Sequence, residues 1–128
     1  DDIPEAAVSA PPLTTVAGLV SHLRWVEEYW FEKILAERPD RAPYHPDDPD
    51  REFRVAAGID MPRLFDGYAR QCAISREIVA GMDLDREVPF RGGVISPRWV
   101  LIHMIEETAR HAGQLDILRE MLDGVTGE

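Results

Sequence analysis

Three residues with the chemistry of metal ligands stand in helical seams that are otherwise apolar. Glu107 and His111 lie four positions apart in the stretch WVLIHMIEETARHAG (99–113), and His22 lies in the seam of an earlier helical stretch. Positions i and i+4 of a helix bring β-carbons to about 5–6 Å, so a carboxylate and an imidazole there can bind one ion. A histidine from a facing helix would complete a set of two imidazoles and one carboxylate. Such a set leaves a coordination position open, as in catalytic zinc sites.

The spacing leaves other interpretations open. His103 also stands four positions from Glu107, and spacing alone does not decide whether His103 or His111 is the ligand. The two histidines are about 12 Å apart along the helix axis, so they cannot both bind one ion together with Glu107. Without a metal, Glu107 could pair with Arg110 or lie partly in solvent, and His22 could be a hydrogen-bonded core histidine.

Three segments with helical periodicity must position these residues, and each begins at a capping residue. They run from Thr14 or Thr15 to about Ala36, from Asp60 to about Gly81, and from Ser96 to Asp123-Gly124. The expected seams are Leu19, His22, Val26 and Tyr29 in the first; Met61, Leu64, Tyr68, Cys72, Ser75, Val79 and Met82 in the second; and Val100, Met104, Glu107, His111, Leu115, Leu118 and Leu122 in the third.

The remaining stretches are expected to be loops. Residues 38–59 are rich in proline and aspartate, and residues 83–95 contain a Gly92-Gly93 turn. The HPDDPD run (45–50) lacks the ligand spacing and the turn glycine of a calcium-binding EF-hand. No stretch alternates convincingly as a strand. The prediction is therefore an all-α helical bundle that forms a single domain over residues 1–128.

The composition excludes several classes of partner. The chain has 14 Lys+Arg against 24 Asp+Glu, a net charge of −10, which argues against nucleic acid or an anionic membrane surface as partner. No apolar run is long enough to span a membrane. Cys72 is the only cysteine and is read as a small core hydrophobe, so a reducing cytoplasm is the expected location.

Two stretches resemble the DinB/YfiT-like metalloenzyme family. GLVSHLRWVEEYWF is similar to the helix that carries that family's first ligand histidine. HMIEETARHAGQLDILREMLDG is similar to its last helix, in which the second and third ligands precede a Gly-Gln pair. The match is closest to an actinobacterial branch with glutamate as the middle ligand. That branch resembles the metal-binding domain of mycothiol-dependent maleylpyruvate isomerase, and the resemblance covers nearly the whole chain.

This resemblance implies a ligand set and an activity. It assigns the metal ligands to His22, Glu107 and His111, because Gly113-Gln114 follows His111, and it makes His103 a neighbour of the site. The implied cofactor is a divalent ion, with zinc expected first and nickel or iron as alternatives. The implied function is a low-molecular-weight-thiol (mycothiol-type) dependent transferase or isomerase. A metal-assisted hydrolase and a non-catalytic metal-stabilised bundle are the alternatives, so whether the protein is an enzyme stays open.

Two departures from the family bear on partners. The family bundle has four helices, and this chain begins where the linker after the first helix would lie. A groove left uncovered in this way predicts association, and we expect a homodimer. The chain also lacks the isomerase's further C-terminal domain.

A small-molecule thiol or substrate is the other expected partner, with Tyr29 and Gln114 as candidates for assisting residues.

Overall fold

The computed structural model describes residues 15–43, 46–48 and 51–124. In these residues the chain is mostly helical, which confirms the predicted all-α bundle. The elements are α2 (Val16–Glu27), η2 (Glu28–Leu35), α3 (Arg51–Ala57), α4 (Met61–Ala80), β1 (Val88–Phe90), β2 (Gly93–Ile95) and α5 (Pro97–Asp123). None of the described helices is long and apolar enough to cross a membrane.

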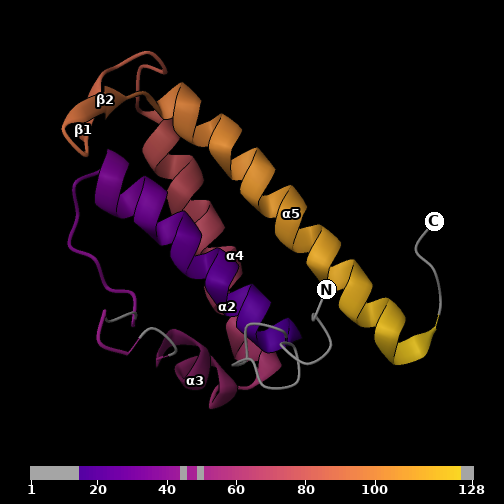
Figure 1. Cartoon of the computed structure of the whole chain (residues 1–128). Coiled ribbons are helices and arrows are strands. Elements are labelled where there is room, and N and C mark those ends of the chain that lie inside the picture. The colour runs from indigo at the N-terminus through magenta and orange to yellow at the C-terminus, as the bar shows by residue number, and fades with distance from the viewer. Residues whose placement is uncertain (1–14, 44–45, 49–50, 125–128) are drawn as a thin grey trace.

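One continuous rod, formed by α2 and η2, is the centre of the bundle. The rod packs against α4 on one side and α5 on the other, whereas α4 and α5 have almost no direct contact (Figure 1). The hairpin β1–β2 lies at one end of the bundle and α3 lies at the other. Because α4 and α5 share the rod with so little direct contact between them, the rod must present different faces to two neighbours.

The predicted helix starts are confirmed by their capping bonds. The side chains of Thr15, Asp60 and Ser96 each accept a hydrogen bond from the backbone N–H three positions later, at 2.9, 3.1 and 3.1 Å. Such caps contribute about 1 kcal/mol each. At the other end of α5, Gly124 adopts a φ of 75°, the left-handed conformation that glycine reaches without strain.

The second half of the rod is a π-helix rather than the predicted α-helix. Residues Glu28–Leu35 are wound with wider turns, and the N–H of Ala36 donates to the carbonyl of Phe31 at 3.0 Å. The buried positions therefore shift away from the expected seam. Phe31 and Leu35 are buried, while the expected seam residue Tyr29 is half-buried.

Three further expectations are wrong in detail. The stretch 38–59 is not all loop, because α3 forms within it. The stretch 83–95 contains two short antiparallel strands, joined at Arg91-Gly92, where both residues have positive φ. Leu122, expected in the third seam, is 82% exposed because α5 extends beyond the rod that covers its earlier turns.

The core has two parts, one at each end of the rod. At the hairpin end, the buried cluster is Phe31, Leu35, Val88, Val100 and Met104. At the other end, α3 contributes to a smaller cluster of Val20, Ala56 and Leu64. Truncation of a buried Leu or Met to Ala typically costs about 2–5 kcal/mol. The candidate ligands lie on α2 and α5, so this packing fixes how their helices face each other.

Candidate functional site

The structure brings two of the three predicted ligands together. The imidazoles of His22, on α2, and His111, on α5, meet edge to face with ring centroids 4.8 Å apart and planes at 78°. His111 is buried and His22 is half-buried. Contacts between α2 and α5 therefore place both rings at one helix interface.

His111 is held from both ring nitrogens. Its Nδ1 lies 2.6 Å from Oε1 of Gln114, one turn later on α5, and its Nε2 lies 3.3 Å from Oε1 of Glu107. When the amide oxygen accepts, Nδ1 carries a proton, and Nε2 then faces the carboxylate either with a proton of its own or with a lone pair. Two electron-pair donors at this distance repel each other unless a proton or a metal ion lies between them. The arrangement is suited to a cation.

Glu107 is the third predicted ligand, and it makes several contacts. Its side chain is 19% exposed, so it is largely shielded although its helix faces solvent on one side. Besides His111, it lies 3.5 Å from Nε2 of His103 and 3.4 Å from Nη1 of Arg110. Glu107 thus has a histidine on either side, and the pairing with Arg110 that was considered for it is present.

The three predicted ligands fit a divalent ion by donor type but are not converged on one point. Among the described residues, no group of three or more His, Cys, Asp or Glu side chains is close enough to form a ready-made metal cluster. Two imidazoles and a carboxylate nevertheless match the donors of catalytic zinc sites. The bond from Nδ1 of His111 to Gln114 is the outer contact that metal-bound histidines ordinarily make. Gln114 is therefore a candidate for orienting His111.

Comparison with protein families places this site in context. The family described as mycothiol-S-transferase matches residues 2–124, almost the whole chain. The chain belongs to the mycothiol-S-transferase family. Comparison with curated proteins and with solved structures finds no match.

In this member of the mycothiol-S-transferase family, the rings of Trp30, Trp99 and His103 form an aromatic wall beside the candidate ligands. The rings of Trp99 and His103 stack with centroids 4.9 Å apart and planes at 7°, and Trp30 meets His103 at 5.0 Å. Phe90, on strand β1, lies 5.2 Å from Trp30 and connects the hairpin to the wall. Helical periodicity in the sequence does not predict this wall, because the π-helical winding of η2 decides where Trp30 points. The other assisting candidate, Tyr29, packs against Trp30 at 5.1 Å.

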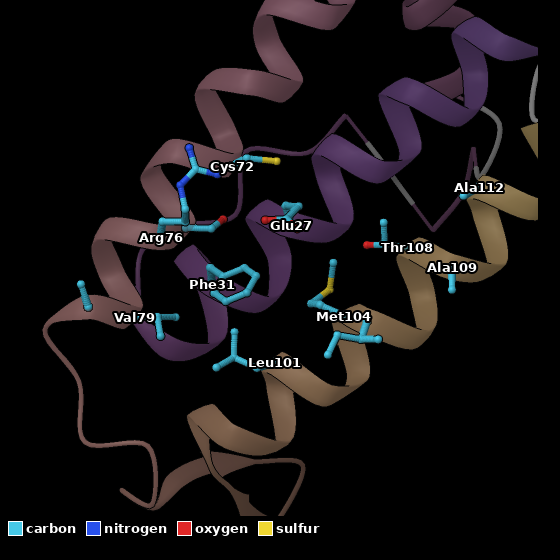
Figure 2. Close-up of a pocket in the computed structure, with 13 residues that line it drawn as sticks. Glu27, Phe31, Cys72, Arg76, Val79, Leu101, Met104, Thr108, Ala109 and Ala112 are labelled. Carbon is cyan, nitrogen blue, oxygen red and sulfur yellow. The ribbon is translucent and has the colours of Figure 1, made fainter.

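A large groove opens on the other side of α5, between α5 and α4. Its volume is about 820 Å³, and its floor is the central rod (Figure 2). Figure 2 shows Phe31 and Glu27 of the rod, Cys72 and Arg76 of α4, and Met104 and Thr108 of α5 around it. None of the predicted ligands lines the groove. The groove and the candidate metal centre are therefore separate features of the family member.

The titratable groups of the groove are perturbed by burial. Burial raises the pKa of Glu27, which a hydrogen bond from Ser75 and the charge of Arg76 partly offset. Burial also raises the pKa of the Cys72 thiol, and the hydroxyl of Tyr68 beside it lowers that pKa in part. A thiol with a raised pKa is a poor nucleophile at neutral pH. Cys72 is therefore a poor candidate nucleophile, but it is half-buried at the groove and lies outside the buried core in which it was expected.

Proposed function

We propose that the protein is a divalent-metal-dependent S-transferase that uses the low-molecular-weight thiol mycothiol as cosubstrate. Membership of the mycothiol-S-transferase family supports the thiol and the reaction type. The observation that supports the site is the contact of His22 with His111, together with Glu107 at 3.3 Å from Nε2 of His111. We assign these three residues as the metal ligands.

The reaction is a thiol transfer. The thiol gives up its proton, its sulfur forms a bond to an electrophilic carbon of the acceptor, and the acceptor's leaving group departs with the electron pair. A bound divalent ion would supply the acidity that this requires, because coordination strongly lowers the pKa of a thiol. Gln114 would hold the Nδ1 proton of His111, so that Nε2 keeps its lone pair. The aromatic wall of Trp30, Trp99 and His103 would exclude water from one side of the site.

The identity of the metal, a related reaction and the location of the protein belong to the same proposal. Zinc is the metal that we expect, with nickel or iron as alternatives, because histidine and carboxylate donors accept all three. The resemblance of the sequence to the metal-binding domain of mycothiol-dependent maleylpyruvate isomerase suggests isomerisation as a related reaction, in which the thiol would be released after adding to the substrate. We place the protein in the cytoplasm, where a lone cysteine such as Cys72 stays reduced.

A non-catalytic bundle is the rival proposal, and one observation favours it. Glu107 already has a cation within 3.4 Å, Nη1 of Arg110, so its charge is partly compensated by the chain itself. In that case the histidines and Glu107 would bind a metal for stability only, or bind none. The two proposals predict different results in one assay.

The decisive experiment measures thiol transfer and metal content in the same samples. Protein without a histidine tag would be incubated with mycothiol and the electrophile monochlorobimane, and the S-conjugate would be quantified by mass spectrometry. We expect conjugation that depends on the divalent ion, that is lost in His111→Ala, and that persists in His103→Ala. Metal bound at one equivalent without any conjugation, with mycothiol and with other thiols, would overturn the S-transferase proposal and favour the non-catalytic bundle.

A further inference from the structure

A second pocket lies between α2 and the first turns of α4, and its lining is basic. Its volume is about 360 Å³, and it is lined by Arg24, Arg63 and Arg70 together with Asp66, Ile59 and Leu64. Three guanidinium groups thus face one carboxylate in a chain whose net charge is −10. The volume lies within the range of small-molecule sites, at its lower end.

Within residues 15–43, 46–48 and 51–124, the arginines of this pocket form no ion pair. Among the described residues, Arg38 and Arg41 pair with Glu32 at 3.2 and 3.4 Å, and Arg41 also lies 3.0 Å from Glu28. Those two glutamates are the acidic neighbours of Arg24, so other cations already engage them. Within the same part of the chain, no carboxylate lies within 4 Å of the guanidinium groups of Arg24, Arg63 or Arg70.

Arg24 is the most constrained of the three. Its Nε is buried without a hydrogen-bond partner in the described residues, and its guanidinium lies over the ring of Trp25 at 4.5 Å. Burial, followed by the charges of Arg70 and Arg41, lowers the pKa of Arg24. Like charges held together with an unsatisfied donor raise the free energy of the folded protein, and a bound anion would relieve both effects.

Gly67 makes room for this arrangement. A β-carbon at position 67 would lie 2.8 Å from Nη1 of Arg24, so any other residue would push the guanidinium away. Gly67 lies on the face of α4 that carries Arg63, Asp66 and Arg70. A glycine in the interior of a helix is destabilising relative to alanine. Here it allows a charged side chain of α2 to lie against the backbone of α4.

We propose that this pocket binds a small oxyanion, a phosphate or carboxylate group of a metabolite, between Arg24, Arg63 and Arg70. Arginine suits such groups because its planar fork donates two parallel hydrogen bonds to them. The helix start itself adds little, because the N-cap carboxylate of Asp60 already accepts from the backbone N–H of Arg63, so the guanidinium groups carry the site. The site uses none of the candidate metal ligands, so it stands independently of the proposed function.

The test titrates inorganic phosphate and, separately, succinate into the protein by calorimetry at constant ionic strength. We expect one saturable site for at least one of the two anions. Arg24→Gln and Arg70→Gln should weaken binding about tenfold or more, because each removes a charge-assisted hydrogen bond. Preference for phosphate or for succinate identifies the ligand class, and either preference supports the site.

Two variants and two controls separate this site from general charge effects. Gly67→Ala leaves the net charge unchanged but displaces Arg24, so it should weaken anion binding while the melting temperature is maintained. Asp66→Asn should strengthen binding, because it removes the opposing carboxylate. Arg91→Gln, an equal change of charge on the distant hairpin, and His111→Ala should leave the affinity unchanged. Equal binding in all variants, no saturable binding of either anion, or loss of binding in His111→Ala would overturn the proposal.

Discussion

The imidazoles of His22 and His111 come from different helices, α2 and α5, and meet with ring centroids 4.8 Å apart. Two histidines that meet in a hydrophobic helix interface are uncommon, because the ring nitrogens of each imidazole need hydrogen-bond or metal partners there. The contact brings two imidazole donors to one place, and Glu107 extends the set on the α5 side.

One divalent ion should bind per chain, and it should depend on the assigned ligands. Replacing His22, Glu107 or His111 with alanine should remove stoichiometric metal, because three protein donors are needed to hold the ion. His103→Ala should keep it, since His103 contacts Glu107 without belonging to the assigned set. Elemental analysis of tag-free protein measures the metal content of the wild type and of each variant. Loss of metal in His103→Ala, with retention in His111→Ala, would show that the ligand assignment is wrong.

Metal removal should lower the thermal stability of the wild type. An ion that binds only the folded state adds about 2.7 kcal/mol at a hundredfold excess over its dissociation constant, which corresponds to roughly 10 °C for a domain of this size. Melting curves with and without a chelator measure the difference. The difference in melting temperature between the metal-bound and metal-free protein should shrink in acid, because protons compete with the ion for the imidazole nitrogens of His22 and His111. Superimposed curves for wild type at neutral pH, after confirmed metal removal, would contradict the prediction.

Gln114 should act as a positioning residue for His111. Gln114→Leu removes the acceptor of the Nδ1 proton and should weaken metal affinity about 10- to 100-fold. Gln114→Glu keeps an acceptor oxygen at that place and should restore most of the affinity. Glu120→Gln, an exposed change on the same helix, is the control. Competition titrations against a chromogenic chelator give the dissociation constants, and equal values for Gln114→Leu and wild type would remove Gln114 from the site.

Glu27 should destabilise the fold at neutral pH. Burial raises the pKa of this carboxyl above the ordinary value of 4.5 that it has in the unfolded chain. The unfolded state therefore ionises first, and stability falls as the pH rises from about that ordinary value through the folded-state pKa. Glu27→Gln should then melt higher than wild type at neutral pH, and the two should converge in acid. A lower melting temperature of Glu27→Gln at neutral pH would mean that the contacts with Ser75 and Arg76 outweigh burial.

The homodimer remains a prediction, and the groove between α4 and α5 offers a surface for it. Ile105 lines the groove and is 68% exposed. A glutamate there would place a charge in an apolar interface, so Ile105→Glu should be monomeric while its fold is unchanged. Ile102→Glu is a matched control, because Ile102 is 55% exposed on the same helix but does not line the groove. Light scattering gives the masses, and a monomeric wild type would contradict the dimer.

The sequence predicted the features that depend on local chemistry. The caps at Thr15, Asp60 and Ser96 and the end of α5 at Gly124 follow from one to three residues each, and all are observed. The apolar seam of α4 is also observed, with its members buried or half-buried. The contact of His22 with His111 agrees with the predicted seams of the first and third helical segments, but the positions of the rings depend on how α2 and α5 pack.

Other features depend on packing that no short stretch specifies. Strands of three residues are too short to show alternation, so β1 and β2 could not be predicted from their pattern. The basic pocket requires α2 and α4 to be docked before Arg24 meets Arg63 and Arg70. The place of Trp30 beside His103 depends on the winding of η2, which periodicity at 3.6 residues per turn does not represent.

Because of the π-helix, the number of residues in the central rod cannot change without disturbing its contacts. An α-helix turns the chain by about 100° per residue, and the wider turns of a π-helix rotate it less. If the wide winding were kept, deletion of one residue between Glu28 and Leu35 would rotate every later side chain by the turn of one residue. Leu35 would then leave the core, and Arg38 and Arg41 would no longer reach Glu32 and Glu28. In relatives of this chain, the spacing between the candidate ligand His22 of α2 and the end of the rod should therefore resist insertion and deletion more strongly than the loops do.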